Sequence, residues 1–215
     1  MSVLLPETIK RILVTGGAGF IGGAVVRRLL RDSSVSVFNL DKIGYASDIS
    51  CIEQQLQEVT SPAESRHQLL AVDLTDVEAT AAAVKQADPD LLLHLEAESH
   101  VDRSIDGPEV FLASNISGTF SLLQAVRGHW EQLPKERQHC FRFQHISTDE
   151  VFGSLGVEGR FSEASPYDAR SPYSATKAAS DHWVNSWHHT YGLPVVLTNC
   201  SKTSKVTCLI NGLFF

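Results

Sequence analysis

The segment TGGAGFIG, residues Thr15–Gly22, follows a short β-rich run and opens a stretch with helical spacing of apolar residues, Phe20–Arg31. Its glycines satisfy two spacings at once, G-x-G-x-x-G with Gly17, Gly19 and Gly22 and G-x-x-G-x-x-G with Gly16, Gly19 and Gly22. In either register a tight turn brings bare backbone to a pyrophosphate, and the helix N-terminus supplies free N–H groups. We therefore predict a dinucleotide-binding loop; a plain strand-to-helix turn is the alternative.

An acidic residue supports the prediction of a dinucleotide-binding loop. Asp41 ends the next β-rich run, 19 residues after Gly22, where a carboxylate can accept hydrogen bonds from an adenosine ribose. A carboxylate there also repels a 2′-phosphate and so favours NAD over NADP, although the neighbouring Lys42 weakens this argument. Asp73 and Leu74 follow a third such run and could reach the adenine; Asp73 could equally begin a helix.

Strand-like and helix-like segments alternate along the chain. The predicted strands are Arg11–Thr15, Val35–Leu40, Leu69–Val72, Leu91–Leu95, Phe141–Ile146 and Val195–Thr198. The predicted helices are Phe20–Arg31, Asp76–Ala87, Glu109–Arg127 and Ser174–Tyr191. This alternation predicts βαβ units and an α/β fold, a Rossmann-type doubly wound parallel sheet with flanking helices. We expect one domain over residues 1–201, followed by a divergent tail over residues 202–215.

The composition narrows the classes of function. The 215 residues carry a formal net charge of -7, which argues against a nucleic-acid partner. No apolar run reaches membrane-spanning length and no signal peptide is evident, so we expect a cytoplasmic protein without a membrane partner. Four scattered cysteines without a CxxC pair predict neither a disulfide framework nor a metal site.

Tyr173 and Lys177 stand four residues apart at the start of a predicted helix and so share a face. A lysine ammonium near a phenol is expected to lower the pKa of the tyrosine toward that of a usable base. The pair could then take a proton from a sugar hydroxyl while hydride leaves for the nicotinamide, and Lys177 could hold the nicotinamide ribose. By itself this spacing occurs by chance in many helices.

Three polar residues, Thr148, Asp149 and Glu150, follow the fifth predicted strand. The carboxyl ends of parallel strands are where ligands bind in this fold. Alcohol oxidation does not need two adjacent carboxyls, whereas loss of water needs a base for a carbon-bound proton and an acid for the departing hydroxyl. The pair therefore indicates dehydration, with a solvated Asp-Glu loop as the alternative.

These motifs together resemble the dTDP-glucose 4,6-dehydratases of the extended short-chain dehydrogenase/reductase family. The likeness runs from about Arg11 to Ser201 and rests on TGGAGFIG (15–22), SHVDRSI (99–105), STDEVFG (147–153), Tyr173–Lys177 and TNCS (198–201). It implies that Tyr173 is the oxidation base, Asp149 the acid and Glu150 the base for the C5 proton, with Thr148 and Ser99 contacting the substrate. The cofactor positions it implies are Phe20, Ile21, Asp41, Lys42, Asp73, Leu74, Leu95, Ala97, Glu98, Ser114, Tyr173 and Lys177.

The same resemblance implies a reaction and an assembly. Bound NAD would oxidise dTDP-glucose at C4, water would leave across C5 and C6, and hydride would return to give dTDP-4-keto-6-deoxyglucose. The family role is supply of sugars such as dTDP-rhamnose for polysaccharides. A homodimer would form through a four-helix interface built from Glu109–Arg127 and Ser174–Tyr191.

The sequence departs from the family pattern in two places. Glu96 replaces an alanine, and we expect its carboxylate to weaken NAD binding by repulsion. After Ser201 the sequence is unrelated to the family, so we expect Lys202–Phe215 to be a truncated or frameshifted end, with the C-terminal substrate lobe missing. Besides an active dehydratase, two readings stay open: another nucleotide-sugar epimerase or reductase on this scaffold, and an inactive NAD-binding remnant.

Overall fold

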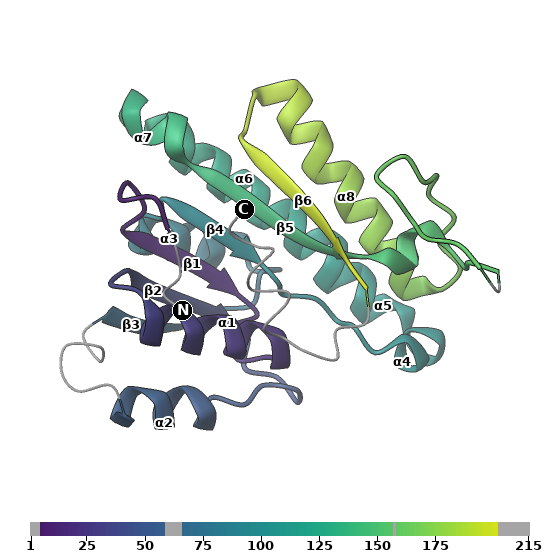
Figure 1. Cartoon of the computed structure of the whole chain (residues 1–215), viewed down its shortest axis with the longest axis horizontal. Helices are drawn as coiled ribbons and strands as arrows, with labels where there is room; N and C mark the ends of the chain where they lie inside the picture. The colour runs from purple at the N-terminus through teal and green to yellow at the C-terminus, as the bar shows by residue number, and fades with distance from the viewer. Residues whose placement is uncertain (1–4, 59–65, 157, 202–215) are drawn as a thin grey trace.

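Six parallel strands form a single twisted sheet in the order β3-β2-β1-β4-β5-β6 (Figure 1). The computed structural model describes residues 5–58, 66–156 and 158–201. The strands are β1 Arg11–Thr15, β2 Ser36–Asp41, β3 His67–Ala71, β4 Leu91–His94, β5 Arg142–Thr148 and β6 Val195–Cys200. The chain runs outward from β1 to β3 and then crosses back to β4. The strand order therefore reverses between β1 and β4, which is where a doubly wound sheet binds its ligand.

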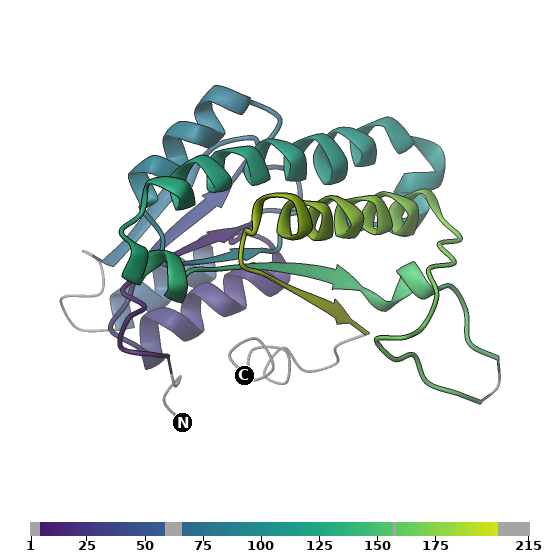
Figure 2. The ribbon, with the colours of Figure 1, turned by 90° about the horizontal axis from the view of Figure 1, so that it is seen from above.

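Helices cover both faces of the sheet (Figures 1 and 2). The helices are α1 Phe20–Asp32, α2 Ser50–Glu58, α3 Val77–Ala87, α4 Val101–Asp106, α5 Pro108–Phe111, a π-helix η2 Leu112–Gly118, α6 Thr119–Gln132, α7 Lys135–Cys140, a 3₁₀ turn η3 Asp149–Phe152 and α8 Pro172–Tyr191. One apolar core joins α3, α6 and α8 to the sheet, and a second joins α1 and α2 to its other face. No helix in the described ranges is both long and apolar enough to cross a bilayer.

The predicted fold class is confirmed, as are all six strands. Strand β1 is buried almost throughout, as expected for a strand covered on both faces. The predicted helix Glu109–Arg127 differs, because it consists of α5, the π-turn η2 and α6. Helices α2, α4 and α7 were not predicted; they have nine, six and six residues, too few for a clear apolar period. The predicted tail, Lys202–Phe215, lies outside the described residues.

A buried carboxylate fastens the amino ends of two strands. Asp90, just before β4, accepts backbone N–H bonds from Lys10 at 2.9 Å and Arg11 at 3.0 Å. The guanidinium of Arg137 donates to its other oxygen at 2.9 Å. Because all these donors lose their partner together, Asp90→Ala is expected to lower the free energy of unfolding by about 3 kcal/mol. Urea unfolding measures this.

The matched control for Asp90 is Asp88→Asn. Asp88 also binds the Arg137 guanidinium, at 3.1 Å, but its side chain is 42% exposed. An exposed ion pair contributes only about 0–1 kcal/mol. If both variants lose the same free energy of unfolding, the hydrogen bonds that Asp90 accepts from the backbone do not stabilise the fold.

Candidate active site

The glycine loop between β1 and α1 packs too tightly for side chains. Gly16 has a φ of +68°, and a Cβ there would lie 2.7 Å from the Cα of Glu96. A Cβ on Gly22 would overlap the carbonyl oxygen of Gly16. Gly19 precedes α1 without a side-chain cap, so no side chain occupies the N–H groups of the first turn. Such a bare helix N-terminus fits a dinucleotide pyrophosphate.

Asp41 holds this loop from the end of β2. One carboxylate oxygen accepts the backbone N–H of Ala18 at 2.9 Å. The other accepts the backbone N–H of Ile43 at 2.9 Å and the Ser47 hydroxyl at 2.8 Å. Asp41 is 5% exposed and still lines the cavity beside the loop. A carboxylate offers about four acceptor positions, so the ribose contact predicted from the sequence is compatible with this bracing role and stays a prediction.

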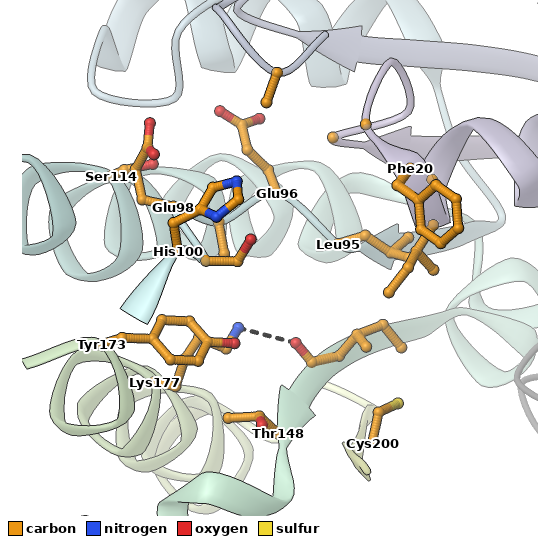
Figure 3. Close-up of a pocket in the computed structure, with 18 of the residues that line it drawn as sticks. Phe20, Leu95, Glu96, Glu98, His100, Ser114, Thr148, Tyr173, Lys177 and Cys200 are labelled. Carbon is orange, nitrogen blue, oxygen red and sulfur yellow. Dashed lines mark hydrogen bonds between the residues drawn. The ribbon is translucent and has the colours of Figure 1, made fainter. Parts of the chain in front are cut away.

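A cavity of about 610 Å³ lies at the carboxyl ends of the strands (Figure 3). The predicted site residues that line it are Gly16, Gly19, Phe20, Ile21, Gly22, Asp41, Lys42, Leu95, Ala97, Glu98, Ser99, Ser114, Thr148, Asp149, Glu150, Tyr173 and Lys177. Two predicted positions lie outside this lining. Leu74 is buried in the core with α3 and α6, and the exposed Asp73 accepts hydrogen bonds from Thr75.

A charged cluster closes one side of the cavity. The Lys42 ammonium lies 3.0 Å from one oxygen of Glu98, and the Tyr45 hydroxyl donates to the other at 3.2 Å. The Arg103 guanidinium stacks 3.9 Å from the centre of the Tyr45 ring. Burial acts to lower the pKa of Lys42, but the bond to Glu98 and its charge outweigh burial and raise it. Lys42 is thus a paired cation, with its charge already compensated inside the protein.

Tyr173 and Lys177 meet the cavity from the first turns of α8. The helix begins with a capping box between Ser171 and Ser174, and Pro172 occupies its first turn. The Lys177 ammonium is buried and donates to the carbonyl of Ile146 at 2.9 Å, the dashed line in Figure 3. Burial lowers the pKa of Lys177 to about 8. The pair therefore lies on one helix face, as the spacing predicts.

The predicted effect of Lys177 on Tyr173 is wrong. Burial, reinforced by the charge of Glu150, raises the pKa of Tyr173 to about 12, and the Thr148 hydroxyl opposes this only in part. The ammonium of Lys177 is instead bound to a main-chain carbonyl of β5. Tyr173 is therefore a neutral phenol at physiological pH in this structure.

The Thr148-Asp149-Glu150 cluster turns the chain at the end of β5. Thr148 is the N-cap of η3, and its hydroxyl accepts the backbone N–H of Glu150 at 3.3 Å. Asn199 on β6 donates to the Thr148 carbonyl at 3.1 Å, which fixes the strand end. Asp149 is half-buried and Glu150 is exposed, and both line the cavity that Tyr173 enters. The two carboxyls and the phenol thus face one space.

Asn115, which the sequence did not reveal, joins the two walls of the cavity. It lies on the π-turn η2; its side-chain oxygen accepts the N–H of Glu98 at 2.8 Å and its amide donates to the Glu98 carbonyl at 3.0 Å. The same amide donates to the hydroxyl of Thr176 on α8 at 2.9 Å. π-turns often occur at functional sites. Apolar spacing carries no signal for such a turn, so sequence alone could not find it.

Glu96, the departure noted in the sequence, is 9% exposed on the cavity wall. Its Oε2 atom is buried without a hydrogen-bond partner. Burial, together with the charge of Asp41, raises the pKa of Glu96 to about 8, and Lys42 opposes this only in part. The sequence predicted a charged carboxylate here. Below about pH 8 the group is instead mostly a neutral acid.

The described residues contain no cluster of His, Cys, Asp or Glu side chains suited to a metal ion. Three cysteines carry free thiols: Cys51, Cys140 and Cys200. Cys200 lines the cavity at the end of β6, and burial raises the pKa of its thiol. Cys208 lies outside the described residues.

Comparison with known proteins connects this geometry to a family. The chain is 49% identical over 195 residues to the dTDP-glucose 4,6-dehydratase of Neisseria meningitidis, covering 90% of this chain and 53% of that protein. It is 46% identical to dTDP-glucose 4,6-dehydratase 1 of Escherichia coli K12, covering 89% and 54%. The chain thus spans about half the length of the curated relatives it matches.

Solved structures of related enzymes show the same similarity. DesIV, a dTDP-glucose 4,6-dehydratase from Streptomyces venezuelae crystallised with NAD and TYD, superposes with a TM-score of 0.74 at 38% identity, covering 88% of this chain and 55% of that one. UDP-glucose 4-epimerase from Thermus thermophilus with NAD gives a TM-score of 0.71 at 28% identity, covering 88% and 54%. A sequence profile for the family described as GDP-mannose 4,6 dehydratase matches residues 13–207. The chain therefore belongs to this dehydratase family.

Proposed function

We propose that this chain carries the catalytic half-site of an NAD-dependent dTDP-glucose 4,6-dehydratase, which forms dTDP-4-keto-6-deoxyglucose and water. One observation carries the proposal: a single cavity at the carboxyl ends of the strands gathers the glycine loop, the Tyr173–Lys177 pair and the carboxyls of Asp149 and Glu150. A simple alcohol oxidation would leave the two carboxyls without a task. The names of the dehydratase relatives support the same substrate.

The residues of the cavity fit NAD. The glycine loop and the first turn of α1 would hold the pyrophosphate, and Asp41 the adenosine ribose. Lys42 is already neutralised by Glu98, so it offers little to a 2′-phosphate, which favours NAD over NADP. Lys177 would hold the nicotinamide ribose. When bound, NAD⁺ supplies a hydride acceptor for the sugar C4 and later returns the hydride to C6.

We assign each proton transfer of the reaction to one side chain. Only the phenolate form of Tyr173, the minor form at physiological pH, takes the proton of the C4 hydroxyl, and the hydrogen bond with Thr148 favours that form. The C4 ketone acidifies the C5 proton, which Glu150 removes. Asp149 protonates the C6 hydroxyl, which leaves as water, and Glu150 returns its proton to C5 when C6 regains hydride. Proton exchange with solvent then restores Asp149 and Tyr173. The two carboxyls thus act as base and acid on neighbouring carbons.

Mass spectrometry of the nucleotide sugar tests this proposal. The purified chain is incubated with dTDP-glucose and NAD⁺, and the expected product is lighter by one water. Asp149→Asn and Glu150→Gln are each expected to slow water loss by about 10²–10⁴-fold, the usual contribution of a positioned acid or base. Calorimetry with NAD⁺ should show binding unchanged in both variants. A folded, NAD-binding chain that only inverts a sugar carbon would overturn the dehydratase in favour of an epimerase.

We further propose that the chain pairs with a second copy through α6 and α8, which lie side by side on one face of the sheet (Figure 2). Their aromatic residues form edge-to-face contacts, Phe120 with Trp183 and Trp187 with Tyr191. Phe120 is 37% exposed, and Trp183 and Tyr191 are 38% exposed each. A row of exposed aromatic rings on adjacent helices favours an interface.

Light scattering tests the pairing. We expect a concentrated sample to show twice the mass of one chain and Trp183→Glu to show the mass of one, because a carboxylate in an apolar interface must be desolvated. Val77→Glu, an exposed apolar position on α3, should keep the double mass. A single-chain mass for the unmodified protein at high concentration would contradict this interface.

A further inference from the structure

A buried carboxylate lies one helical turn beyond Lys177. Asp181 on α8 has a fully buried side chain. One of its oxygens accepts the Ser147 hydroxyl at 2.8 Å and the Tyr167 hydroxyl at 3.0 Å. The other lies 3.2 Å from Nε2 of His145, without the alignment of a hydrogen bond. Such a carboxylate, removed from water, needs a nearby positive charge.

The buried histidines His145 and His94 do not supply that charge. Burial lowers the pKa of His145 well below its usual range, and the charge of Lys177 lowers it further. Burial acts in the same way on His94, whose ring centre is 5.1 Å from that of His145. Both imidazoles are therefore neutral at physiological pH. Lys177 is a buried cation four residues from Asp181 on the same helix face, and its charge acts on Asp181, as does that of the neighbouring His182.

The other titratable groups around the pair come from each packed element. His182 on α8 and Tyr167 in the preceding loop face Asp181. Cys200 on β6 faces Lys177. Burial acts to lower the pKa of Lys177, whereas the charge of Asp181 acts to raise it. The protonation state of Lys177 thus depends on a balance between burial and the charge of Asp181, with a smaller contribution from Cys200.

We propose that Asp181 is a positioning residue whose carboxylate keeps Lys177 in its ammonium form. Burial raises the pKa of Asp181, and the hydrogen bonds that Ser147 and Tyr167 donate act against this rise and favour the ionised form. The inference rests on the proposed function only where it assigns the charged Lys177 a task in catalysis. Without Asp181, burial alone would leave Lys177 as a neutral amine, a poorer hydrogen-bond donor to the nicotinamide ribose that it is proposed to hold.

The titration of Lys177 itself is the test. In the full chain labelled with ¹³C,¹⁵N-lysine, the NMR signal of Lys177 is the one that disappears in Lys177→Met. We expect Asp181→Asn to move the titration midpoint of Lys177 down by at least about one pH unit. Ser186→Ala removes a hydroxyl from the same helix that bonds the carbonyl of Trp183 rather than Asp181, so it should leave the midpoint of Lys177 unchanged. An unchanged midpoint in folded Asp181→Asn overturns the proposal.

A reciprocal measurement covers the case in which Asp181→Asn does not fold. Coupling between two sites is mutual, so Lys177→Met must raise the midpoint of Asp181 by the same amount. This is read from ¹³C-aspartate signals, and an unshifted Asp181 overturns the proposal equally well. Neither titration needs cofactor or sugar. A chain that shows the coupling but no water loss therefore disproves the dehydratase proposal alone.

Discussion

Replacing Gly22 by alanine is expected to raise the Kd for NAD⁺ about 100-fold, which corresponds to a loss of about 2.8 kcal/mol of binding free energy. The added Cβ would overlap the carbonyl oxygen of Gly16 and press on the Cα of Gly17. Both are backbone atoms, which cannot rotate away as a side chain can. The loop must therefore shift at the place where the pyrophosphate is proposed to bind. Overpacking of this kind should also lower the free energy of unfolding by about 1–3 kcal/mol.

The neighbouring Gly23→Ala is the matched control. Its Cβ would lie 3.4 Å from the Gly17 carbonyl oxygen and 3.5 Å from the Arg27 guanidinium, which are ordinary contacts. Alanine in a helix interior is favoured over glycine by about 0.5–1 kcal/mol, so this variant should be slightly more stable and bind NAD⁺ unchanged. Isothermal calorimetry and urea unfolding measure both quantities. Similar NAD⁺ affinity in the two variants would show that the loop does not hold the pyrophosphate.

The sheet could be predicted from the sequence because its strands are short apolar runs bounded by turn residues. β1 and β4, buried on both faces, show this most clearly. The π-turn Leu112–Gly118 could not be predicted. It keeps the apolar spacing of a helix almost intact, and its residue Asn115 bonds Glu98 and Thr176, which are distant in sequence. Local periodicity contains no information about such partners.

The site was predictable to the extent that it follows from topology. Motifs at the ends of β1, β2, β4 and β5 must meet at one edge of a parallel sheet, and the cavity confirms that they do. Protonation states were not predictable in the same way. The rise in the pKa of Tyr173 and the closeness of Asp181 to His145 depend on burial and on residues far apart in sequence. A spacing of four between Tyr173 and Lys177 fixes a helix face but not where the ammonium binds.

Ionisation of Glu96 is expected to have a large effect on the stability of the folded chain. Burial raises its pKa from 4.5 in the ordinary carboxyl to about 8 in the folded chain. Between these values the folded state keeps a proton that the unfolded state has lost, so stability is present below pH 4.5 and is lost as pH rises to 8. The loss approaches about 5 kcal/mol, from 1.4 kcal/mol per unit of pKa. Urea unfolding should therefore show Glu96→Gln increasingly more stable than the unmodified chain from pH 5 to pH 8.

The same ionisation should act on ligand binding. Glu96 lines the cavity near Asp41 and Glu98, so its ionised form adds a negative charge close to the proposed pyrophosphate site. ADP is the ligand to use, because Lys177 also has a pKa of about 8 and is proposed to contact only the nicotinamide half of NAD. We expect the Kd for ADP to rise by no more than about twofold between pH 7 and 8, and by up to about tenfold per pH unit above pH 8.

In Glu96→Gln the Kd for ADP should stay constant across this range, because the amide keeps the shape of the side chain and cannot ionise. Glu150→Gln removes a carboxyl that lines the same cavity from the turn after β5, outside the glycine loop, and should keep the rise above pH 8. A rise that persists in Glu96→Gln would mean that another group titrates. No rise in the unmodified chain would mean that the buried carboxyl does not face the phosphates. Either result would show that ionisation of Glu96 lowers the stability of the folded chain without weakening ADP binding.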